Sequence, residues 1–357
     1  MLLFFMLPQQ FSALSLFEFL LFVLRLYVAG MQAVQSYQSC CVCTHTWSRG
    51  PRRKCIYDGY RRFTPMGSHA RAPRVQHADN VYEYRDAEIR APPRLRTDEL
   101  VRATAIYARR RRQPVMGHKT FPLLANWPGF SWYRMNTPDL MHDSKLLLEM
   151  LLKLMVGHVT DAGSYSSWSK DDKHRADAQR YGVWRDIWPG QDGPLPWRLT
   201  REDRRELDSR MLSLKWPHHL DRIAYRGFSF WEKPNRLWKI KRKITTLYYV
   251  LPTALRDKVP PLRTAIQTFV WAMRRLEGQV HSHDTAVHGL GVTPGSKTVP
   301  KSIIRSANND LIRSLCLFEG CIPGTHLNPA LHHFAHYALY TKSHGSLRLY
   351  WMMAFER

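Results

Sequence analysis

Two pairs of side chains have the residue types and the spacing to bind a metal ion. Cys40 and Cys43 form a Cys-x2-Cys motif, in which two thiolates can chelate one Zn²⁺ from a tight turn. His332 and His336 are four residues apart, so on a helix they lie on one face, one turn apart. Together the two pairs complete a Cys2His2 zinc site. Free cysteines and a surface histidine pair are the alternative that the spacing leaves open.

The distance along the chain between the pairs is large, but a metal ion can offset it. From Cys43 to His332 is 332 − 43 = 289 residues. Closing a loop of that length costs about 5 kcal/mol, whereas a structural zinc supplies about 10–16 kcal/mol in small peptides. A zinc ion can therefore hold the two ends of the intervening region together, provided that this region is compact.

Carboxylates stand at two further positions of interest. Asp139 and His142 are three residues apart in the first turn of an expected helix, where they can touch and bind a metal or hold a proton. An acid at a helix N-terminus is also favoured by the helix dipole alone, which is the simpler explanation. Glu356 is the penultimate residue, and by itself it indicates nothing.

The positive charge of the chain favours a polyanionic partner. Of the 357 residues, 53 are Lys or Arg and 29 are Asp or Glu, giving a formal charge of +24. Such a balance disfavours cationic substrates and suits a nucleic acid or an acidic membrane. An aromatic content of 12% excludes a fully disordered chain, and six cysteines are too few for a scaffold built on disulfides.

Two basic runs are the candidate contacts to DNA phosphates. Residues 49–112 hold 17 Lys and Arg against 7 Asp and Glu, and they end in the first run, which is Arg109, Arg110, Arg111 and Arg112. The second lies in residues 236–243, where the candidates are Lys239, Lys241, Arg242 and Lys243. Cations pair with phosphates without regard to base sequence, so non-specific, electrostatic DNA binding is expected and no small-molecule substrate is implied.

The pattern of apolar residues and helix caps predicts a mostly α-helical chain. Thr97 and Thr200 stand where N-caps are expected, and Thr137 with Pro138 begins the most apolar helix. No alternating strand pattern is evident after residue 40. The predicted helices span 97–113, 137–156, 200–215, 236–257, 261–280, 302–319, 328–341 and 346–357. The expected segments are 1–30 (apolar), 31–96 (basic and loop-rich, with the Cys-x2-Cys motif), 97–300 (helical) and 301–357 (C-terminal helices).

Residues 1–30 are apolar enough to raise the question of a membrane anchor. About 20 residues cross a bilayer, but Glu18 and Arg25 interrupt this run and Pro8 breaks it early. No basic segment precedes it and no clean cleavage site follows it. A buried helix or strand pair, or a mistaken gene start, is the favoured explanation of this segment. Membrane anchoring through residues 1–30 is kept as an alternative.

In this order, the motifs resemble those of CACTA (En/Spm-type) transposases. Residues 40–43 with 57–65 resemble the family's CPxC followed by Y-x-G-H-R-R-F-L-P. Residues 117–127 followed by Pro138 to His142 resemble its G…P-L…L-P…D-x-M-H segment. Residues 251–260 resemble its L-P-x-x-L…L-P helices.

The most specific part of the resemblance closes the chain. Residues 315–323, His332-x3-His336, Gly345 and residues 350–357 follow one another as in the family's L-C-E-L-E…P…H-x3-H…G-P…W-M-Y-P-F-E-R. Ala354 stands where the family has Pro. The resemblance covers residues 30–357.

The resemblance implies a specific architecture and chemistry. Such transposases are similar to RNase H-fold DDE recombinases, in which three carboxylates hold two Mg²⁺ ions that activate and stabilise the reacting oxygens. It implies a long helical insertion between the second Asp and the last Glu, pinned by zinc on Cys40, Cys43, His332 and His336. It also implies that Glu356, 356 − 336 = 20 residues after His336, is the third carboxylate. Asp139 and His142 match its D-x-M-H motif without an assigned role.

The chain departs from the family where the first two carboxylates are expected. Both should precede the Cys-x2-Cys motif, but the only acid before Asp58 is Glu18. One carboxylate does not hold a pair of Mg²⁺ ions. We therefore expect an incomplete catalytic α/β core, no strand transfer by this chain alone, and Mg²⁺ binding only if the missing acids are supplied elsewhere.

The resulting expectation is a transposase-derived, nuclear, DNA-binding protein with a structural zinc. The alternatives are a non-enzymatic nucleic-acid-binding protein that reuses the basic helical insertion, and the membrane-anchored protein described above.

Overall fold

The computed structural model describes residues 40–45, 48–49, 55–56, 76–77, 80–81, 94–122, 128, 131–132, 140–156, 197–213, 243, 245–278, 298–322 and 326–347. By contacts between Cα atoms the chain divides into two compact units. The first unit comprises residues 1–47 and 93–137, and the second comprises residues 48–92 and 138–357.

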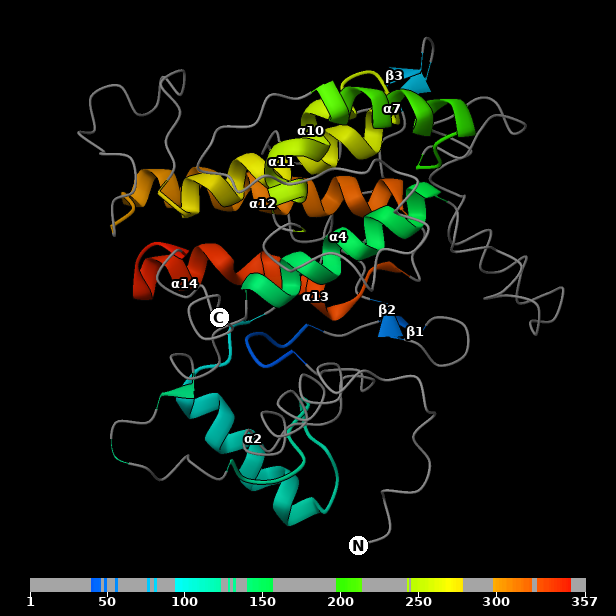
Figure 1. Ribbon diagram of the computed structural model, residues 1–357. Helices are drawn as coiled ribbons and strands as arrows, with labels where there is room; N and C mark the ends of the chain where they lie inside the picture. Colours follow the sequence, from blue (N-terminus) through cyan, green and yellow to red (C-terminus); the bar gives the residue numbers. More distant parts are fainter. Residues whose placement is uncertain are drawn as a thin grey trace, which may run out of the picture. The chain divides into compact units, whose positions relative to one another are not determined.

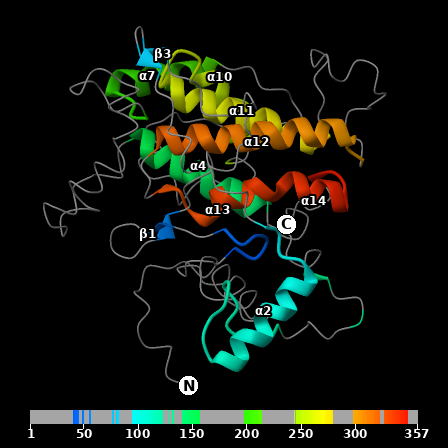
Figure 2. The same cartoon turned by 180° about the vertical axis from the view of Figure 1, so that it is seen from behind.

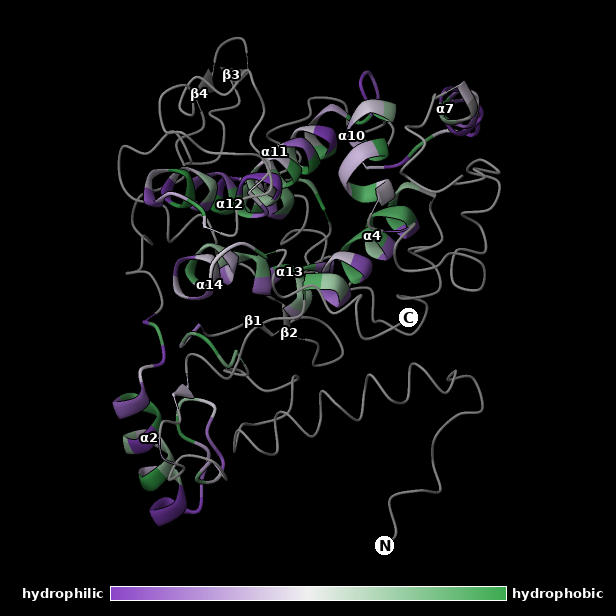
Figure 3. Cartoon of the chain, turned by 60° about the vertical axis from the view of Figure 1, so that its left-hand side comes forward, coloured by the Kyte–Doolittle hydropathy of each residue, from purple (hydrophilic) through white to green (hydrophobic). Residues whose placement is uncertain are grey.

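The described part of the first unit contains one long helix, α2 (Asp98–Arg111). Its start is set by the Thr97 side chain, which accepts a hydrogen bond from the Leu100 backbone N–H at 3.2 Å. It ends at Arg112, whose backbone is left-handed (φ 52°) and whose N–H reaches the last free carbonyls of the helix. Val101, Ala105 and Ala108 form its buried stripe, and Figure 3 shows hydrophobic and hydrophilic patches along it.

A tight turn follows α2 and places a histidine in the interior of the first unit. The backbones of Val115 and His118 exchange two hydrogen bonds of 2.9 Å. Met116 and Gly117 between them have φ angles of 46° and 85°, the signature of a type I′ hairpin turn. The His118 ring is fully buried and meets the Trp132 ring edge to face, with centroids 5.2 Å apart.

Within its described residues, the second unit is helical apart from two hairpins of two-residue strands. Antiparallel pairing joins β1 (Ser48–Arg49) to β2 (Cys55–Ile56) and β3 (Gln76–His77) to β4 (Asn80–Val81). The helical elements are α4 (Leu140–Val156), α7 (Arg201–Ser213), the π-turn η5 (Thr246–Val250), α10 (Leu251–Ala254), α11 (Pro260–Leu276), α12 (Lys301–Cys321), α13 (Pro329–His333), the 3₁₀ turn η7 (Phe334–His336) and α14 (Tyr337–His344).

The core of the second unit lies around the pair α11 and α12, which run side by side in both Figure 1 and Figure 2. Phe269 of α11 is fully buried and meets Phe318 and Phe334 edge to face, at centroid distances of 6.4 and 4.6 Å. Because Phe334 belongs to η7, this aromatic cluster fixes the η7 turn against α11 and α12. α4 packs against α13, and most of the apolar residues of α4 are buried.

Surface charges and a capping box stabilise α7. Thr200 and Asp203 cap the helix reciprocally, since the Asp203 N–H reaches the Thr200 Oγ1 at 3.0 Å and Asp203 Oδ2 accepts from the Thr200 N–H at 2.9 Å. Arg210 pairs with Glu206 and Asp257 and donates to the Ala254 carbonyl at 3.0 Å. The Arg210 guanidinium holds the pKa of Asp257 well below its usual range.

Over the residues that the structure describes, the prediction of a mostly α-helical fold is confirmed. The caps Thr97 and Thr200 lie where they were expected, and α2, α4, α7, α11, α12 and α13–α14 fall within two or three residues of the predicted bounds or inside them. Of the predicted helix 236–257 the structure describes residues 243 and 245–257, and the η5 π-turn interrupts them. Residues 1–30, 137–139 and 348–357 lie outside the described part of the chain. Within the described part, no helix combines the length and the apolar character that crossing a bilayer requires.

Candidate metal centre

The Cys-x2-Cys loop of the first unit presents two buried sulfurs that accept backbone hydrogen bonds. The Val42 N–H donates to the Cys40 Sγ and the His45 N–H donates to the Cys43 Sγ, each at 3.4 Å. Cys40 and Cys43 are 2% and 0% exposed. The thiolate is the form of cysteine that binds metal.

Arg96 supports the same loop from within the first unit. Its buried guanidinium Nε donates to the carbonyl oxygens of Cys40 and Cys43 at 2.8 and 3.0 Å. Burial lowers the pKa of Arg96, but the nearby sulfurs act in the opposite direction. The guanidinium thus holds the loop closed and places a positive charge beside the thiols.

Trp132 closes the loop on its other side. The indole Nε1–H of this buried residue donates to the Cys41 carbonyl at 2.6 Å, and its backbone N–H donates to Asp98 at the start of α2 at 2.5 Å. Backbone hydrogen bonds between Val42 and Arg96 and between Thr44 and Arg94, both 2.9 Å, complete the loop. The cysteines are therefore held by groups at residues 94–98 and 132, far along the sequence.

The histidine pair of the second unit lies on the α13–η7 segment. Asn328 caps α13 by accepting from the Leu331 N–H at 2.9 Å, and Pro329 occupies the first turn. His332 and His336 are 2% and 6% exposed. Their Nε2 atoms face one another at 3.1 Å, and the rings meet nearly at right angles.

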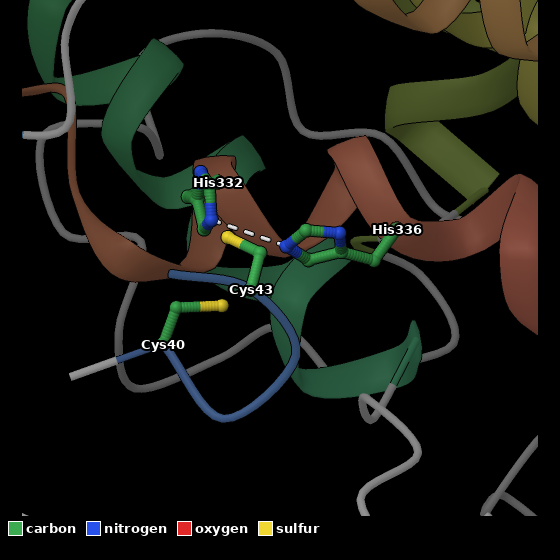
Figure 4. Close-up of side chains that lie close together, drawn as sticks. All are labelled: Cys40, Cys43, His332 and His336. Carbon is green, nitrogen blue, oxygen red and sulfur yellow. Dashed lines mark hydrogen bonds between the residues drawn. The ribbon is translucent and has the colours of Figure 1, made fainter. Parts of the chain in front are cut away.

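The four predicted ligands form one buried group. The sulfurs of Cys40 and Cys43 and a ring nitrogen of His332 and of His336 lie within 4.8 Å of one another, and Figure 4 shows the side chains pointing toward a common centre. Among the described residues this is the group of metal-ligating side chains that could hold an ion. The expected Cys2His2 cluster is therefore present.

The donor set and its spacing fit a tetrahedral metal ion. Zn–N bonds of about 2.0–2.1 Å and Zn–S bonds of about 2.3 Å place the ligand atoms of a tetrahedron about 3.3–3.8 Å apart. The 3.1 Å between the two Nε2 atoms is close to the lower value. Two thiolates also neutralise a divalent cation, so that the buried centre carries no net charge.

Cys321 shows the contrasting environment of a structural thiol. It is buried in α12 at 2% exposure, and burial alone raises its pKa well above the usual range. The raised pKa keeps this side chain a neutral thiol, which is a poor metal ligand.

The basic run on α2 lies at the surface, whereas part of the second run does not. Arg109 to Arg112 are all exposed, and the Arg111 guanidinium lies 5.0 Å from the centroid of the Tyr107 ring. Lys243 is only 4% exposed and pairs with Glu149 of α4, so it is not placed to contact a phosphate. Lys239, Lys241 and Arg242 lie outside the described residues.

The remaining predicted site residues are only partly described. His142 is half-buried in the first turn of α4, while Asp139 and Glu356 lie outside the described residues. The acid that the structure places in that turn with partners is Asp143, which the sequence did not single out. Sequence reasoning also missed four residues that support the site, which are Arg96, Trp132, His333 and Tyr337. For His333 and Tyr337 the one available signal was that each directly follows a histidine of the His-x3-His motif.

Comparison with known proteins gives no matching family model, no matching curated protein and no matching solved structure.

Proposed function

We propose that this protein is a zinc-stabilised DNA-binding protein of CACTA-transposase ancestry, which acts in the nucleus. The observation that carries the proposal is the buried group of Cys40, Cys43, His332 and His336. Two short motifs 289 residues apart in the sequence converge, and the resemblance to the transposases implies this ligand set. The helical insertion of an RNase H-like transposase, with an incomplete catalytic α/β core, is part of the same proposal.

Zinc has a structural role in this proposal. All four ligands come from the protein and all four are buried, so the centre is closed, as structural zinc sites are. A catalytic zinc would need an open position for water or substrate. The ion would join the Cys-x2-Cys loop to the α13–η7 segment and so hold the helical region as one body.

DNA binding is proposed for the exposed end of α2. After Glu99 the helix contains no acid, and its last turn with Arg112 presents four exposed guanidiniums. Some of this charge suits the helix dipole, which favours cations at the C-terminus. Four adjacent arginines without an acidic partner in the same turns nevertheless form a concentrated site for phosphates.

The proposal comprises binding and not strand cleavage. Cleavage by two metal ions requires several carboxylates around one site, and within the described residues the group found is Cys2His2 instead. We therefore expect the purified chain to leave plasmid DNA intact in Mg²⁺ or Mn²⁺. Metal-dependent nicking that co-purifies with the wild-type chain would contradict this part.

The metal content of the purified protein tests the proposed zinc centre. The full chain, purified without added metal and analysed by mass spectrometry, should contain about one zinc per molecule. Cys43→Ala should abolish stoichiometric zinc, and the matched Cys321→Ala, which also removes a buried thiol, should retain it. Folded wild-type protein without zinc, or equal loss in both variants, would contradict the proposed centre.

The salt dependence of binding tests the proposal that α2 binds DNA. Binding to a fluorescent duplex is measured from 50 to 300 mM salt, and the slope of log K against log salt reports the number of phosphates contacted. Arg109→Gln with Arg110→Gln should reduce that slope by about 1.8, at about 0.9 per lost contact. The control, Arg201→Gln with Arg205→Gln, removes the same charge from α7, where an acid directly follows each arginine. Equal slopes for the two double variants would exclude α2 as the binding surface.

A further inference from the structure

We propose that Asp143 is a positioning residue for the histidine half of the metal centre. This inference rests on the proposed zinc site. Asp143 stands in the first turn of α4, and its side chain is 8% exposed. Its carboxylate accepts a hydrogen bond from the Tyr337 hydroxyl at 2.9 Å, and both of its oxygens lie 3.1 Å from the His333 Nδ1.

The two partners of Asp143 immediately follow the two ligands in the sequence. His333 comes after His332, and Tyr337 comes after His336. One carboxylate on α4 therefore holds both turns of the ligand-bearing segment from the adjacent face. Because a carboxylate only accepts hydrogen bonds, the His333 Nδ1 carries the proton in this contact.

The ligand-bearing segment needs such support because it is not a regular helix. α13 has five residues and gives way to the 3₁₀ turn η7, and α14 begins only at Tyr337. A 3₁₀ turn in the middle of a helical run has poorer hydrogen-bond geometry than the α-helix around it. The spacing of the two Nε2 atoms therefore depends on contacts outside the segment.

Two of the contacts that the segment makes with other elements act on different residues. The aromatic packing of Phe334 against Phe269 holds the middle of the segment. Asp143 holds the residues adjacent to the ligands and sets the rotation of the two turns about the helix axis. Metal sites lose affinity when supporting groups outside the ligand set are removed, typically 10–100-fold. The same range is expected here.

The experiment compares metal affinity and stability in Asp143 variants of the full chain. Zinc affinity is measured by competition with a chelator, and the absorption spectrum of Co²⁺ in the site reports ligand geometry. Asp143→Ala should weaken zinc binding about 10–100-fold and alter the Co²⁺ bands. Asp143→Asn should lose less, because its amide oxygen still accepts from the Tyr337 hydroxyl. The control is Asp310→Asn, which breaks an ion pair between α12 and Arg275 of α11 in the same unit and should leave zinc affinity within about twofold of wild type.

Each outcome decides between the two proposals. A wild-type chain without zinc overturns the metal centre and this inference together. A wild-type chain that binds zinc, with Asp143→Ala unchanged in affinity and in the Co²⁺ spectrum, overturns the positioning role alone, even if the variant unfolds more easily. If Asp143→Ala does not fold, Asp143→Asn and Tyr337→Phe decide instead. Each of these two variants is then expected to weaken zinc binding several-fold. If both bind zinc with wild-type affinity, Asp143 does not position the histidine ligands.

Discussion

Protonation of His118 should weaken the fold as the pH falls below 6.5. The imidazole is fully buried, and both of its ring nitrogens lack a hydrogen-bond partner. Burial, helped by the nearby Arg96 cation, lowers the pKa of His118 from 6.5 to about 3. The folded state therefore requires the neutral ring at pH values at which the unfolded chain already binds a proton.

The sign and the size follow from this difference in proton binding. Between about pH 6.5 and pH 3 the unfolded state holds more protons, so the free energy of unfolding decreases as the pH decreases. At pH 5 the contribution of His118 is about 2 kcal/mol, taking 1.36 kcal/mol per pKa unit over the 1.5 units below 6.5. The folded value hardly affects this figure, because the buried ring is still neutral at pH 5.

Urea denaturation at pH 7.5 and at pH 5 measures this contribution. His118→Phe keeps an aromatic ring against Trp132 but cannot bind a proton. Wild type should lose about 2 kcal/mol more than this variant between the two pH values. Contributions from the zinc ligands and other groups are common to both proteins and cancel in the difference.

A control separates titration from loss of packing. Thr104→Val removes a buried hydroxyl of the same unit, one that donates to the Leu100 carbonyl at 2.7 Å, and does not titrate. It should lower stability equally at both pH values. If His118→Phe and wild type show the same pH dependence within about 0.5 kcal/mol, against the roughly 2 kcal/mol expected, the reasoning from burial is refuted.

Three further predictions follow from single contacts. Lys243→Met should lower the free energy of unfolding by about 1–3 kcal/mol, because it leaves the partly buried Glu149 carboxylate without its partner. The salt dependence of DNA binding should not change, and the reverse pattern would restore Lys243 as a DNA contact. Arg96→Lys should weaken zinc binding at least about tenfold in chelator competition, because an ammonium cannot reproduce the guanidinium contacts to the Cys-x2-Cys loop. Unchanged zinc affinity would show that the loop keeps its conformation without these contacts. Thr200→Ala should cost about 1 kcal/mol in urea denaturation by removing the cap shared with Asp203, and no measurable loss would mean that α7 does not depend on its cap.

The helices could be predicted because their ends depend on local interactions. Thr97 and Thr200 each accept a backbone N–H within their own first turn, so the residue type and its position suffice. The π-turn before α10 could not be predicted, since no residue type in Thr246 to Val250 demands it.

The types of the metal ligands were also evident in the sequence, because Cys-x2-Cys and His-x3-His spacings are local. Their convergence was only a hypothesis, since the 289 residues between Cys43 and His332 fix no distance. The loop around the cysteines depends on two residues that are distant in the sequence. Arg96 is 53 positions after Cys43, and Trp132 is 91 positions after Cys41.

Sequence alone therefore determined what each segment can do by itself: begin a helix, present two thiolates, or carry charge. Tertiary packing decided which of those capacities is used. Lys243 reads as a surface cation in a basic run, yet packing against α4 buries it beside Glu149. Asp143 reads as an ordinary acid at a helix start, yet the face that α13–α14 presents to α4 gives it His333 and Tyr337 as partners. The physical reason is that burial and long-range pairing depend on which faces meet in space, and no local pattern encodes that choice.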